Sequence, residues 1–363
     1  MKRIAIISSY AWIRMANNYG ALLQYFALQQ YFSKKGYYAF WMKFIINRGL
    51  ISKIKTLIKQ IIKSPIICIS SIRCHKSFMS FCKDYLNMTD EIFSYGNSNI
   101  RYPNADYFIT GSDQVWGGTL QENFLTFVDD SHKKIAYAVS FGKDCITDEH
   151  RRIISPWVND FNKISVREKS GLDICKSICG NRIEIQVLLD PTFLIAEQSY
   201  PHIKLEMSER FIFLYVLNLR SKDSIRFNEI LGFSSLIGAR LKVCAVQGAQ
   251  YIFNKHDLVF PSPIEWLSYY RQSECIITNT FHGTVFAIIH RKQFLCILQN
   301  GESALQNTRM LSLLGVLGLE ERILNPESKI NEAMKAPISW EVVYDKIDSL
   351  RKKTDDFFSF LDN

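Results

Sequence analysis

The chain of 363 residues is longer than one hydrophobic core usually supports, so its length predicts two domains. Its composition, with 47% hydrophobic, 13% aromatic and 22% charged residues, is typical of a globular protein and excludes a disordered one. The net charge of +9 predicts anionic partners. Nucleic acid is excluded among them, because no nucleic-acid-binding motif is present and the basic residues are not interleaved with aromatic ones.

The sequence also predicts a cytoplasmic protein. No apolar stretch reaches the roughly 18 residues of a membrane span, and the apolar run after Met1-Lys2-Arg3 is too short for a signal peptide. The nine cysteines are odd in number, scattered and never in a C-x-x-C pair, which indicates reduced thiols. Cys175 and Cys179 are four residues apart, but no second pair of ligands is near in sequence, so we expect no metal site.

The first lobe is expected to span residues 1–195. Short apolar runs alternate there with helical patterns, which is typical of parallel sheets built from β-α-β units. A strand at 3–8 leads into a helix that opens at 17–20 and ends at Gly36. Further strands are expected at 37–41, 107–110, 135–139, 164–166 and 187–189.

An insert at about residues 45–80 interrupts this lobe. From Leu50 to Lys63 the apolar side chains fall on one face of a helix, and Lys53, Lys55 and Lys59 lie on the rest. One interpretation is peripheral contact with an anionic membrane at the inner face of the cell. The other is a surface helix packed on the lobe through its apolar side, with the lysines in water.

The second lobe is expected at residues 196–335, with strands at 211–217, 241–246 and 275–278. The sequence therefore predicts an α/β fold in which two Rossmann-like lobes face each other across a cleft. Residues 336–363 contain an amphipathic helix that we expect to return to the first lobe.

Four polar clusters follow expected strands, where ligands of open α/β sheets bind. In the first, at residues 17–24, Gly20 permits close backbone approach and the first N–H groups of the helix can hold an anion. The second, at 111–116, contains Asp113, a candidate base for an acceptor hydroxyl. Helix capping explains either cluster without a ligand.

The third cluster, at residues 165–171, contains Arg167, whose guanidinium can bind a carboxylate or phosphate through two parallel hydrogen bonds. A surface contact with Glu168 is the alternative. The fourth cluster, at 278–284, joins an apolar strand to an apolar helix and contains His282. Most lone histidines are structural, but this one shares a single turn with Thr280 and other polar groups, which favours a functional role.

The order of these clusters resembles the polysaccharide pyruvyl transferase family. The matching stretches are NYGALLQ at 18–24, GSDQVW at 111–116, SVRE at 165–168, DPT at 190–192 and FHGT at 281–284. Arg309 lies in a weaker match, and the resemblance covers nearly the whole chain. Two positions depart from the family pattern: Thr280, where Ser is more frequent, and Gly117, where Asn is. These departures affect acceptor specificity more than reaction type.

The resemblance implies a two-lobed fold like that of the B-type glycosyltransferases. It implies phosphoenolpyruvate as donor, no metal or other cofactor, and a pyruvyl ketal formed on a saccharide or lipid-linked oligosaccharide during capsule or exopolysaccharide synthesis. By motif match, His282 is the general acid, Arg167 a ligand of the donor anion, and Asp113 a donor-site residue or the base. The other expected substrate-binding residues are Asn18, Tyr19, Gly20, Gln24, Gly111, Ser112, Asn279, Thr280, Gly283, Thr284 and Arg309.

This assignment requires His282 and Arg167 to meet in one electropositive cleft between the lobes. A nucleotide-sugar-dependent glycosyltransferase of the same fold is one alternative, and a nucleoside diphosphate would then bind in place of phosphoenolpyruvate. A non-catalytic saccharide-binding relative is the other.

Overall fold

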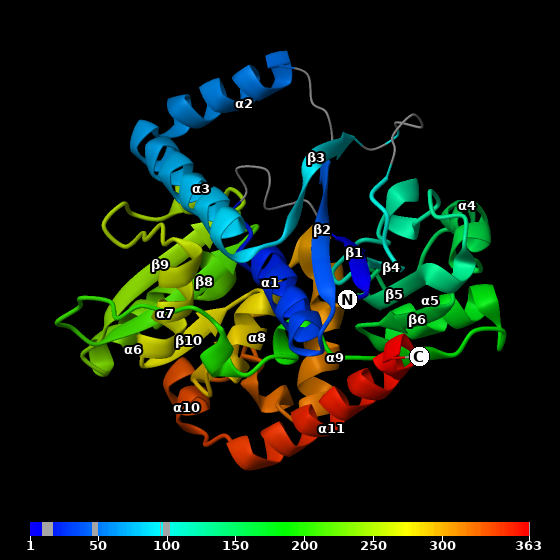
Figure 1. Cartoon of the computed structure of the whole chain (residues 1–363). Helices are drawn as coiled ribbons and strands as arrows, with labels where there is room; N and C mark the ends of the chain where they lie inside the picture. The colour runs from blue at the N-terminus through cyan, green and yellow to red at the C-terminus, as the bar shows by residue number, and fades with distance from the viewer. Residues whose placement is uncertain (9–16, 46–49, 95, 97–101, 363) are drawn as a thin grey trace.

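The computed structural model describes residues 1–8, 17–45, 50–94, 96 and 102–362. Residues 46–49 of the expected insert lie outside this range, as do the side chains of Leu50, Ile51 and Lys53. Figure 1 shows two sheets with helices on their faces.

The first lobe is built on a sheet of seven strands in the order β3-β2-β1-β4-β5-β6-β7. The described pairs are all parallel. Its central strands are buried on both faces, which is why they read as continuous apolar runs in the sequence. The strands are β1 (Arg3–Ile7), β2 (Tyr38–Ile45), β3 (Met88–Ser94), β4 (Tyr107–Thr110), β5 (Lys134–Val139), β6 (Lys163–Val166) and β7 (Ile185–Val187).

The helices of this lobe are α1 (Tyr19–Lys34), α2 (Leu50–Lys63), α3 (Pro65–Tyr85), α4 (Asp148–Val158) and α5 (Lys169–Cys179). Helix α1 is buried along nearly its whole length, because it packs on the first sheet and also contacts the second lobe. The ring of Tyr19, its first residue, stacks on that of Trp266 with the centroids 5.1 Å apart.

The second lobe contains a parallel sheet of four strands in the order β11-β10-β8-β9. Its strands are β8 (Phe211–Leu217), β9 (Arg240–Val246), β10 (Cys275–Thr278) and β11 (Gln293–Cys296). Its helices are α6 (Phe227–Leu236), α7 (Pro263–Gln272), α8 (Phe281–Ile289), α9 (Asn307–Leu317) and α10 (Ile330–Lys335). The expected α/β fold with two parallel sheets is confirmed, and β3 and β11 are strands that the sequence patterns did not predict.

The last helix, α11 (Trp340–Phe358), runs across the bottom of the molecule in Figure 1 and ends against the first lobe. The Tyr31 hydroxyl donates a hydrogen bond to Asp355 over 2.8 Å, and the ring of Phe358 lies 5.0 Å from that of Tyr137. The chain therefore finishes on the lobe where it starts.

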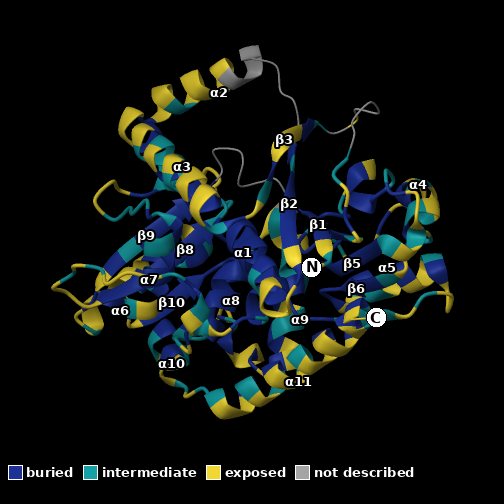
Figure 2. Ribbon diagram, in the orientation of Figure 1, coloured by how far each residue is buried: buried dark blue, intermediate teal, exposed yellow. Residues whose placement is uncertain are grey.

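Helix α2 stands away from the body of the protein at the top of Figure 1. Its side chains from Ile54 to Ile62 are exposed except for Gln60, which is half-buried (Figure 2). The interpretation of α2 as a helix packed through its apolar side is therefore wrong. No described helix combines the length and the apolar composition that crossing a bilayer requires.

Candidate functional site

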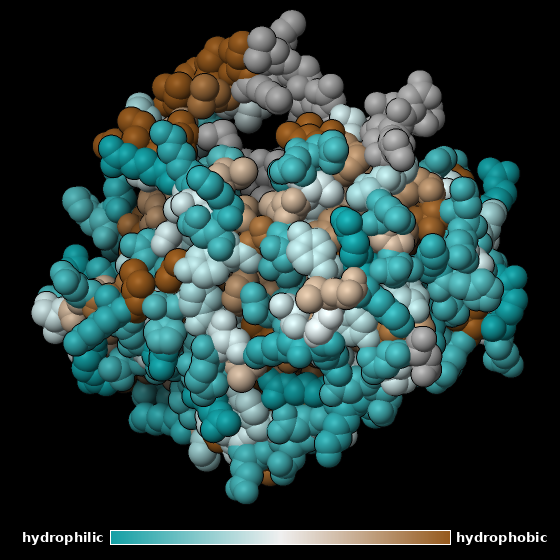
Figure 3. Space-filling view, in the orientation of Figure 1, coloured by the Kyte–Doolittle hydropathy of each residue, from teal (hydrophilic) through white to brown (hydrophobic). Residues whose placement is uncertain are grey.

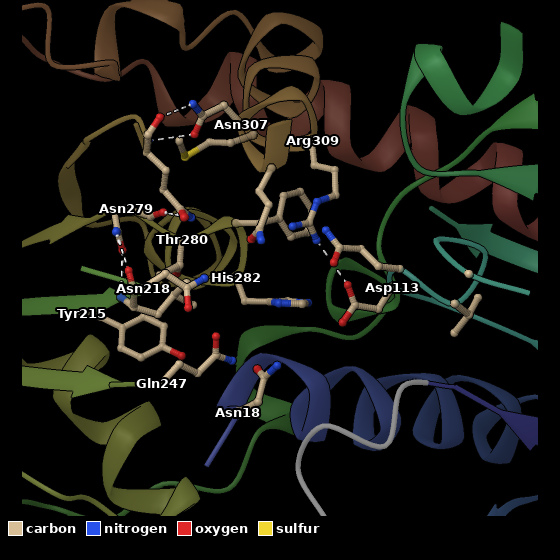
Figure 4. Close-up of a pocket in the computed structure, with 18 of the residues that line it drawn as sticks. Asn18, Asp113, Tyr215, Asn218, Gln247, Asn279, Thr280, His282, Asn307 and Arg309 are labelled. Carbon is tan, nitrogen blue, oxygen red and sulfur yellow. Dashed lines mark hydrogen bonds and ion pairs between the residues drawn. The ribbon is translucent and has the colours of Figure 1, made fainter. Parts of the chain in front are cut away.

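A cavity of about 400 Å³ opens between the two lobes, at the carboxyl ends of strands from both sheets (Figure 4). The first lobe contributes residues from the start of α1 and from the segment after β4, and the second contributes residues that follow β8, β9, β10 and β11. Two parallel sheets that face each other through their carboxyl ends place loops from both lobes around one space. The polar lining residues are Asn18, Asp113, Gln114, Asn123, Tyr215, Asn218, Gln247, Asn279, Thr280, His282, Gln299, Gln306, Asn307 and Arg309.

Three helices begin at the wall of this cavity. Asn18 caps α1 by accepting a hydrogen bond from the Ala21 N–H over 3.1 Å, and Thr280 caps α8 in the same way through Gly283 N–H over 2.8 Å. Asn307 is the first residue of α9. Helix α9 continues from the 3-10 helix at Gly301–Gln306, and the Asn307 N–H already donates to the Ala304 carbonyl oxygen. At α1 and α8 the helix N-terminus carries a partial positive charge. The cavity is therefore suited to an anion even where its side chains are neutral.

A buried network of charged groups lies at the first-lobe side of the cavity. Arg167 donates from Nη1 to Asp190 Oδ2 over 2.6 Å and from Nη2 to Asp113 Oδ1 over 3.0 Å. Arg309, from α9, donates to the same Asp113 oxygen over 3.2 Å. The Phe281 ring lies between the lobes beside both guanidiniums, with its centroid 4.3 Å from Arg167 Cζ and 5.7 Å from Arg309 Cζ. The network thus joins β6, the loop after β4, the loop after β7 and α9.

His282 reaches this network from the second lobe, and Figure 4 shows it and Arg309 pointing toward Asp113. Its Nε2 lies 3.5 Å from Asp190 Oδ2. Its ring packs directly on Gly20 of α1, where a Cβ atom would lie 2.1 Å from His282 Cγ. Gly20 is therefore required by the close approach of an imidazole rather than by the turn itself.

The electrostatics of the two aspartates follow from these contacts. Burial by itself raises the pKa of Asp190, but His282, Arg167 and Thr192 outweigh burial and hold its pKa well below the usual range. Burial likewise opposes ionisation of Asp113, and the guanidiniums of Arg167 and Arg309 lower its pKa. Both carboxylates are therefore charged at neutral pH.

Arg309 has an unusual environment for an arginine. Its burial and the neighbouring Arg167 lower its pKa to about 10, although Asp113 opposes the shift. It stays positively charged at neutral pH but is poorly solvated, so an anionic ligand would gain more from it than from a surface arginine.

The backbone around Asp113 is held in a conformation that few side chains adopt. Asp113 has φ +78° and Gly111 φ +115°, and a Cβ atom on Gly111 would lie 2.1 Å from the Tyr137 carbonyl oxygen. Non-glycine residues in this region cost about 1–3 kcal/mol and occur often at functional sites. The compact turn after β4 thus turns the carboxylate of Asp113 toward Arg167 and Arg309.

The structure brings some of the predicted site residues to the cavity and keeps others behind it. Asn18, Asp113, Asn279, Thr280, His282 and Arg309 line it. Arg167 does not, because its side chain is 2% exposed and is held between two aspartates. His282 and Arg167 nevertheless meet, since both contact Oδ2 of Asp190.

The remaining predicted residues have packing roles in this structure. Tyr19 is buried between the lobes and donates to the Pro261 carbonyl oxygen over 2.7 Å. Ser112 donates to the Ala138 carbonyl oxygen over 2.8 Å, and Gln24 donates to Ser8 over 3.4 Å. Thr284 donates to the Thr280 carbonyl oxygen inside α8. Gly283 allows α8 to start close to β10, because a Cβ atom there would lie 2.1 Å from Thr278 Oγ1.

The expected electropositive cleft is less positive than the sequence suggests. Among the described residues, Arg309 and His282 are the basic side chains in the lining, and Asp113 is the acidic one. Arg167 does not add to the positive charge of the wall, because Asp190 and Asp113 neutralise it. The positive character of the cavity therefore rests on Arg309, His282 and the helix N-termini.

Sequence reasoning missed two groups of residues. Asp190 lies in the DPT motif, which by itself indicates no role for it, although it joins Arg167 to His282. Asn218 and Gln247 line the cavity directly after β8 and β9. Both have positive φ, at +56° and +54°. Their position in the sequence could have identified them, because each is an amide residue directly after an apolar strand, where ligands of α/β sheets bind.

The comparisons with known proteins agree with this architecture. A family model described as polysaccharide pyruvyl transferase matches residues 18–300, a range that includes Asp113, Arg167 and His282. No curated protein matches the chain significantly.

Two solved structures are similar to the chain with a TM-score of 0.51. One is the S. aureus MnaA–UDP co-structure, with 10% identity over 100% of this chain and 97% of that chain. The other is Methanocaldococcus jannaschii UDP-GlcNAc 2-epimerase in complex with UDP-GlcNAc and UDP, with 11% identity over 96% of this chain and 99% of that chain. At such low identity the likeness shows the fold alone, which is the two-lobed fold shared by B-type glycosyltransferases and these epimerases.

Proposed function

Because the chain belongs to the polysaccharide pyruvyl transferase family, we propose that it transfers the pyruvyl group of phosphoenolpyruvate to two hydroxyls of a saccharide and forms a cyclic ketal. The observation that carries this proposal is the convergence of the N-termini of α1 and α8 with Arg309 and His282 on one cavity.

Donor binding follows from that convergence. Phosphoenolpyruvate carries a carboxylate and a phosphate on one small carbon frame, so it needs several positive groups close together. Arg309 offers a poorly solvated guanidinium, and the first turns of α1 and α8 offer N–H groups. The family resemblance implies that Arg167 binds the donor anion. In this proposal it acts indirectly instead, by holding the side chains of Asp113 and Asp190 in place.

His282 is the proton donor in this proposal. Ketal formation adds a proton to the methylene carbon of phosphoenolpyruvate while an acceptor hydroxyl attacks the adjacent carbon. A second hydroxyl then displaces inorganic phosphate. The ionised Asp190 lies 3.5 Å from Nε2 and fixes the orientation of the imidazole ring.

Asp113 is a weaker base than the sequence predicts. Two guanidiniums lower its pKa, and a base works best when its pKa is near the working pH. We assign it to accept a hydrogen bond from the attacking hydroxyl and to hold Arg309. The proton of that hydroxyl can return to His282, which restores the imidazolium, and the proton of the second hydroxyl leaves with the phosphate.

The acceptor is proposed to bind among neutral amides. Nine of the described lining residues are Asn or Gln. An amide offers both donors and acceptors without charge, which matches the hydroxyl groups of a sugar. Asn218 and Gln247 lie on the second-lobe side of the cavity.

The test is phosphate release from phosphoenolpyruvate in the presence of a panel of lipid-linked and nitrophenyl sugars, followed by mass spectrometry of the sugar. The proposal expects a gain of one pyruvate minus one water, and loss of turnover by about 10²–10⁴-fold in His282→Ala. Arg240→Gln, a change at an exposed arginine on β9, is the control. Full turnover in folded His282→Ala would remove His282 from the chemistry.

A thermal-unfolding comparison separates this function from nucleotide-sugar chemistry. Phosphoenolpyruvate should raise the unfolding temperature, and uridine diphosphate should not. Protection by uridine diphosphate alone would favour a glycosyltransferase of the same fold.

A further inference from the structure

Helix α2 and the start of α3 form an apolar surface that the cavity does not use. Six of its isoleucines are each at least 45% exposed. They appear as the brown area at the top of Figure 3, and we call them the isoleucine surface. They are Ile54, Ile58, Ile61, Ile62, Ile66 and Ile69. Soluble monomers rarely expose a contiguous apolar patch of this kind without a binding role.

The basic side chains of α2 run alongside this surface. At 3.6 residues per turn, the isoleucines of α2 fall on one side of the helix, and Lys55 and Lys59 lie next to them. Lys63, one turn further along, lies over the ring of Tyr251, with its Nζ 5.2 Å from the ring centroid. Gln60 is half-buried and Ser64 is buried, so the helix faces the protein through its polar side. The isoleucines therefore point away from the body.

Helix α3 holds α2 in this position. Its Phe78 and Phe81 are buried in the core of the first lobe, and Ser64 caps its first turn at the junction with α2. Figure 1 shows α3 rising from the body and carrying α2 outward.

The charge of the chain is concentrated in the same region. The first 83 residues contain 14 of the 44 Lys and Arg residues and none of the 35 Asp and Glu residues. The rest of the chain therefore has a net negative charge. The net positive charge of the whole protein comes from the segment that includes α2 and α3. Such asymmetry indicates an anionic partner for that segment.

We propose that the isoleucine surface binds the headgroup region of an anionic lipid bilayer, with α2 lying parallel to the membrane. The isoleucines would enter the boundary between headgroups and acyl chains, and Lys55 and Lys59 would extend to the lipid phosphates. A second copy of the chain would cover the isoleucines but would bring like-charged lysine rows together. A nucleic acid would neutralise the lysines but leave the isoleucines in water.

This surface is connected to the cavity through short contacts. Asn17 Nδ2 donates to the Ser71 carbonyl oxygen of α3 over 3.3 Å, and the Tyr19 hydroxyl lies 3.4 Å from Cys74 Sγ. These residues flank Asn18, which lines the cavity. If the proposed function holds, the bound membrane would present a lipid-linked acceptor to that side. The lipid binding itself does not depend on the proposed function.

The experiment is sedimentation of the full chain with vesicles of phosphatidylcholine alone and with phosphatidylglycerol added. The proposal expects binding to the anionic vesicles that weakens with salt. Ile58→Ser/Ile62→Ser should weaken binding roughly tenfold or more, and replacing Lys55 and Lys59 by Gln should weaken it by roughly fivefold per lysine.

Matched controls use exposed residues elsewhere. Leu236→Ser/Val342→Ser removes two exposed apolar side chains from α6 and α11. Replacing Lys176 and Lys352 by Gln removes the same charge from other exposed positions. Neither control should change vesicle binding.

Three results would overturn the proposal. The first is no sedimentation with anionic vesicles, and the second is an equal loss in the controls. The third is a different partner: light scattering that shows Ile58→Ser/Ile62→Ser converting a dimer to a monomer, or nucleic acid that binds more tightly than vesicles whether or not the isoleucines are present. Because vesicle binding is measured without turnover, it can fail while pyruvyl transfer succeeds.

Discussion

Gly20 and His282 touch across the boundary between the two lobes, so closely that a Cβ atom on Gly20 would lie 2.1 Å from Cγ of the histidine. The contact links the first turn of α1 to the first turn of α8. It therefore ties the position of the proposed proton donor to the way in which the lobes meet.

We predict that Gly20→Ala displaces the His282 ring and lowers kcat by about a hundredfold or more, because misplacement by 1 Å can cost that much. The added methyl group also overpacks a buried contact, so urea unfolding of the variant separates a displaced ring from a loss of folded protein. Gly118→Ala is the matched control, since Gly118 also lines the cavity and a Cβ atom there meets nothing within 4 Å. Equal activity of the two variants would show that the contact with Gly20 does not position His282.

Asp190→Asn should destabilise the fold by about 3–5 kcal/mol, because it leaves the buried guanidinium of Arg167 without one of its two carboxylates. Urea unfolding measures this change. Ser234→Ala removes a buried hydroxyl that donates to the Ala239 carbonyl oxygen and serves as a control for the loss of a neutral hydrogen bond. A cost no larger than that of the control would mean that the network contributes little to stability.

The same aspartates predict how stability depends on pH. The folded pKa of Asp190 and Asp113 is lowered, so below about pH 4 the unfolded chain binds more protons than the folded one. Their contribution is complete above that pH and is lost as the pH falls through the folded values. Burial raises the pKa of Glu168, so the contribution of this carboxyl group to stability decreases as the pH rises.

The loss of stability between pH 5 and 3 should therefore be smaller in Asp190→Asn than in the unmodified chain. Unfolding midpoints in urea across this range provide the measurement. Identical slopes in the two proteins would contradict the depressed pKa of Asp190.

Arg309→Lys should raise KM for phosphoenolpyruvate at least tenfold with a smaller effect on stability, because lysine keeps the charge but loses the paired hydrogen-bonding geometry. Arg167→Lys should do the reverse, since Arg167 is buried between two carboxylates and does not line the cavity. Steady-state kinetics measures KM for both variants, and urea unfolding measures their stability. A larger KM effect from Arg167→Lys would restore Arg167 as the direct ligand.

Tyr19→Phe should cost about 1 kcal/mol of stability and leave donor affinity unchanged. The hydroxyl donates to the Pro261 carbonyl oxygen, which Cys74 Sγ also contacts over 3.3 Å, so the carbonyl keeps a partner. Calorimetric titration with phosphoenolpyruvate checks the affinity. A tenfold loss of affinity for phosphoenolpyruvate would show that Tyr19 binds this substrate.

Much of the fold can be read from local patterns. The strands at 211–217 and 275–278 are found where the apolar runs predict them, because a strand buried on both faces must be apolar throughout. Position at a strand end likewise predicted Asp113, Thr280 and His282 as neighbours of one cavity. Strand β3 was missed because three of its seven side chains are exposed and it lacks a continuous apolar run.

The partners of the charged residues depend on distances that no local pattern contains. Arg167 and Asp190 are 23 residues apart and meet because β6 and β7 are neighbours in the first sheet. Arg309 and Asp113 are 196 residues apart and meet because α9 reaches the end of that sheet. A buried guanidinium pairs with the carboxylates that the fold brings within reach. Arg167, which the motif indicates as a substrate ligand, is therefore already paired with Asp113 and Asp190. Residue types and strand ends are thus determined by the order of amino acids, while the carboxylates that Arg167 and Arg309 contact, and which of the two lines the cavity, are determined by how the strands and the two lobes pack.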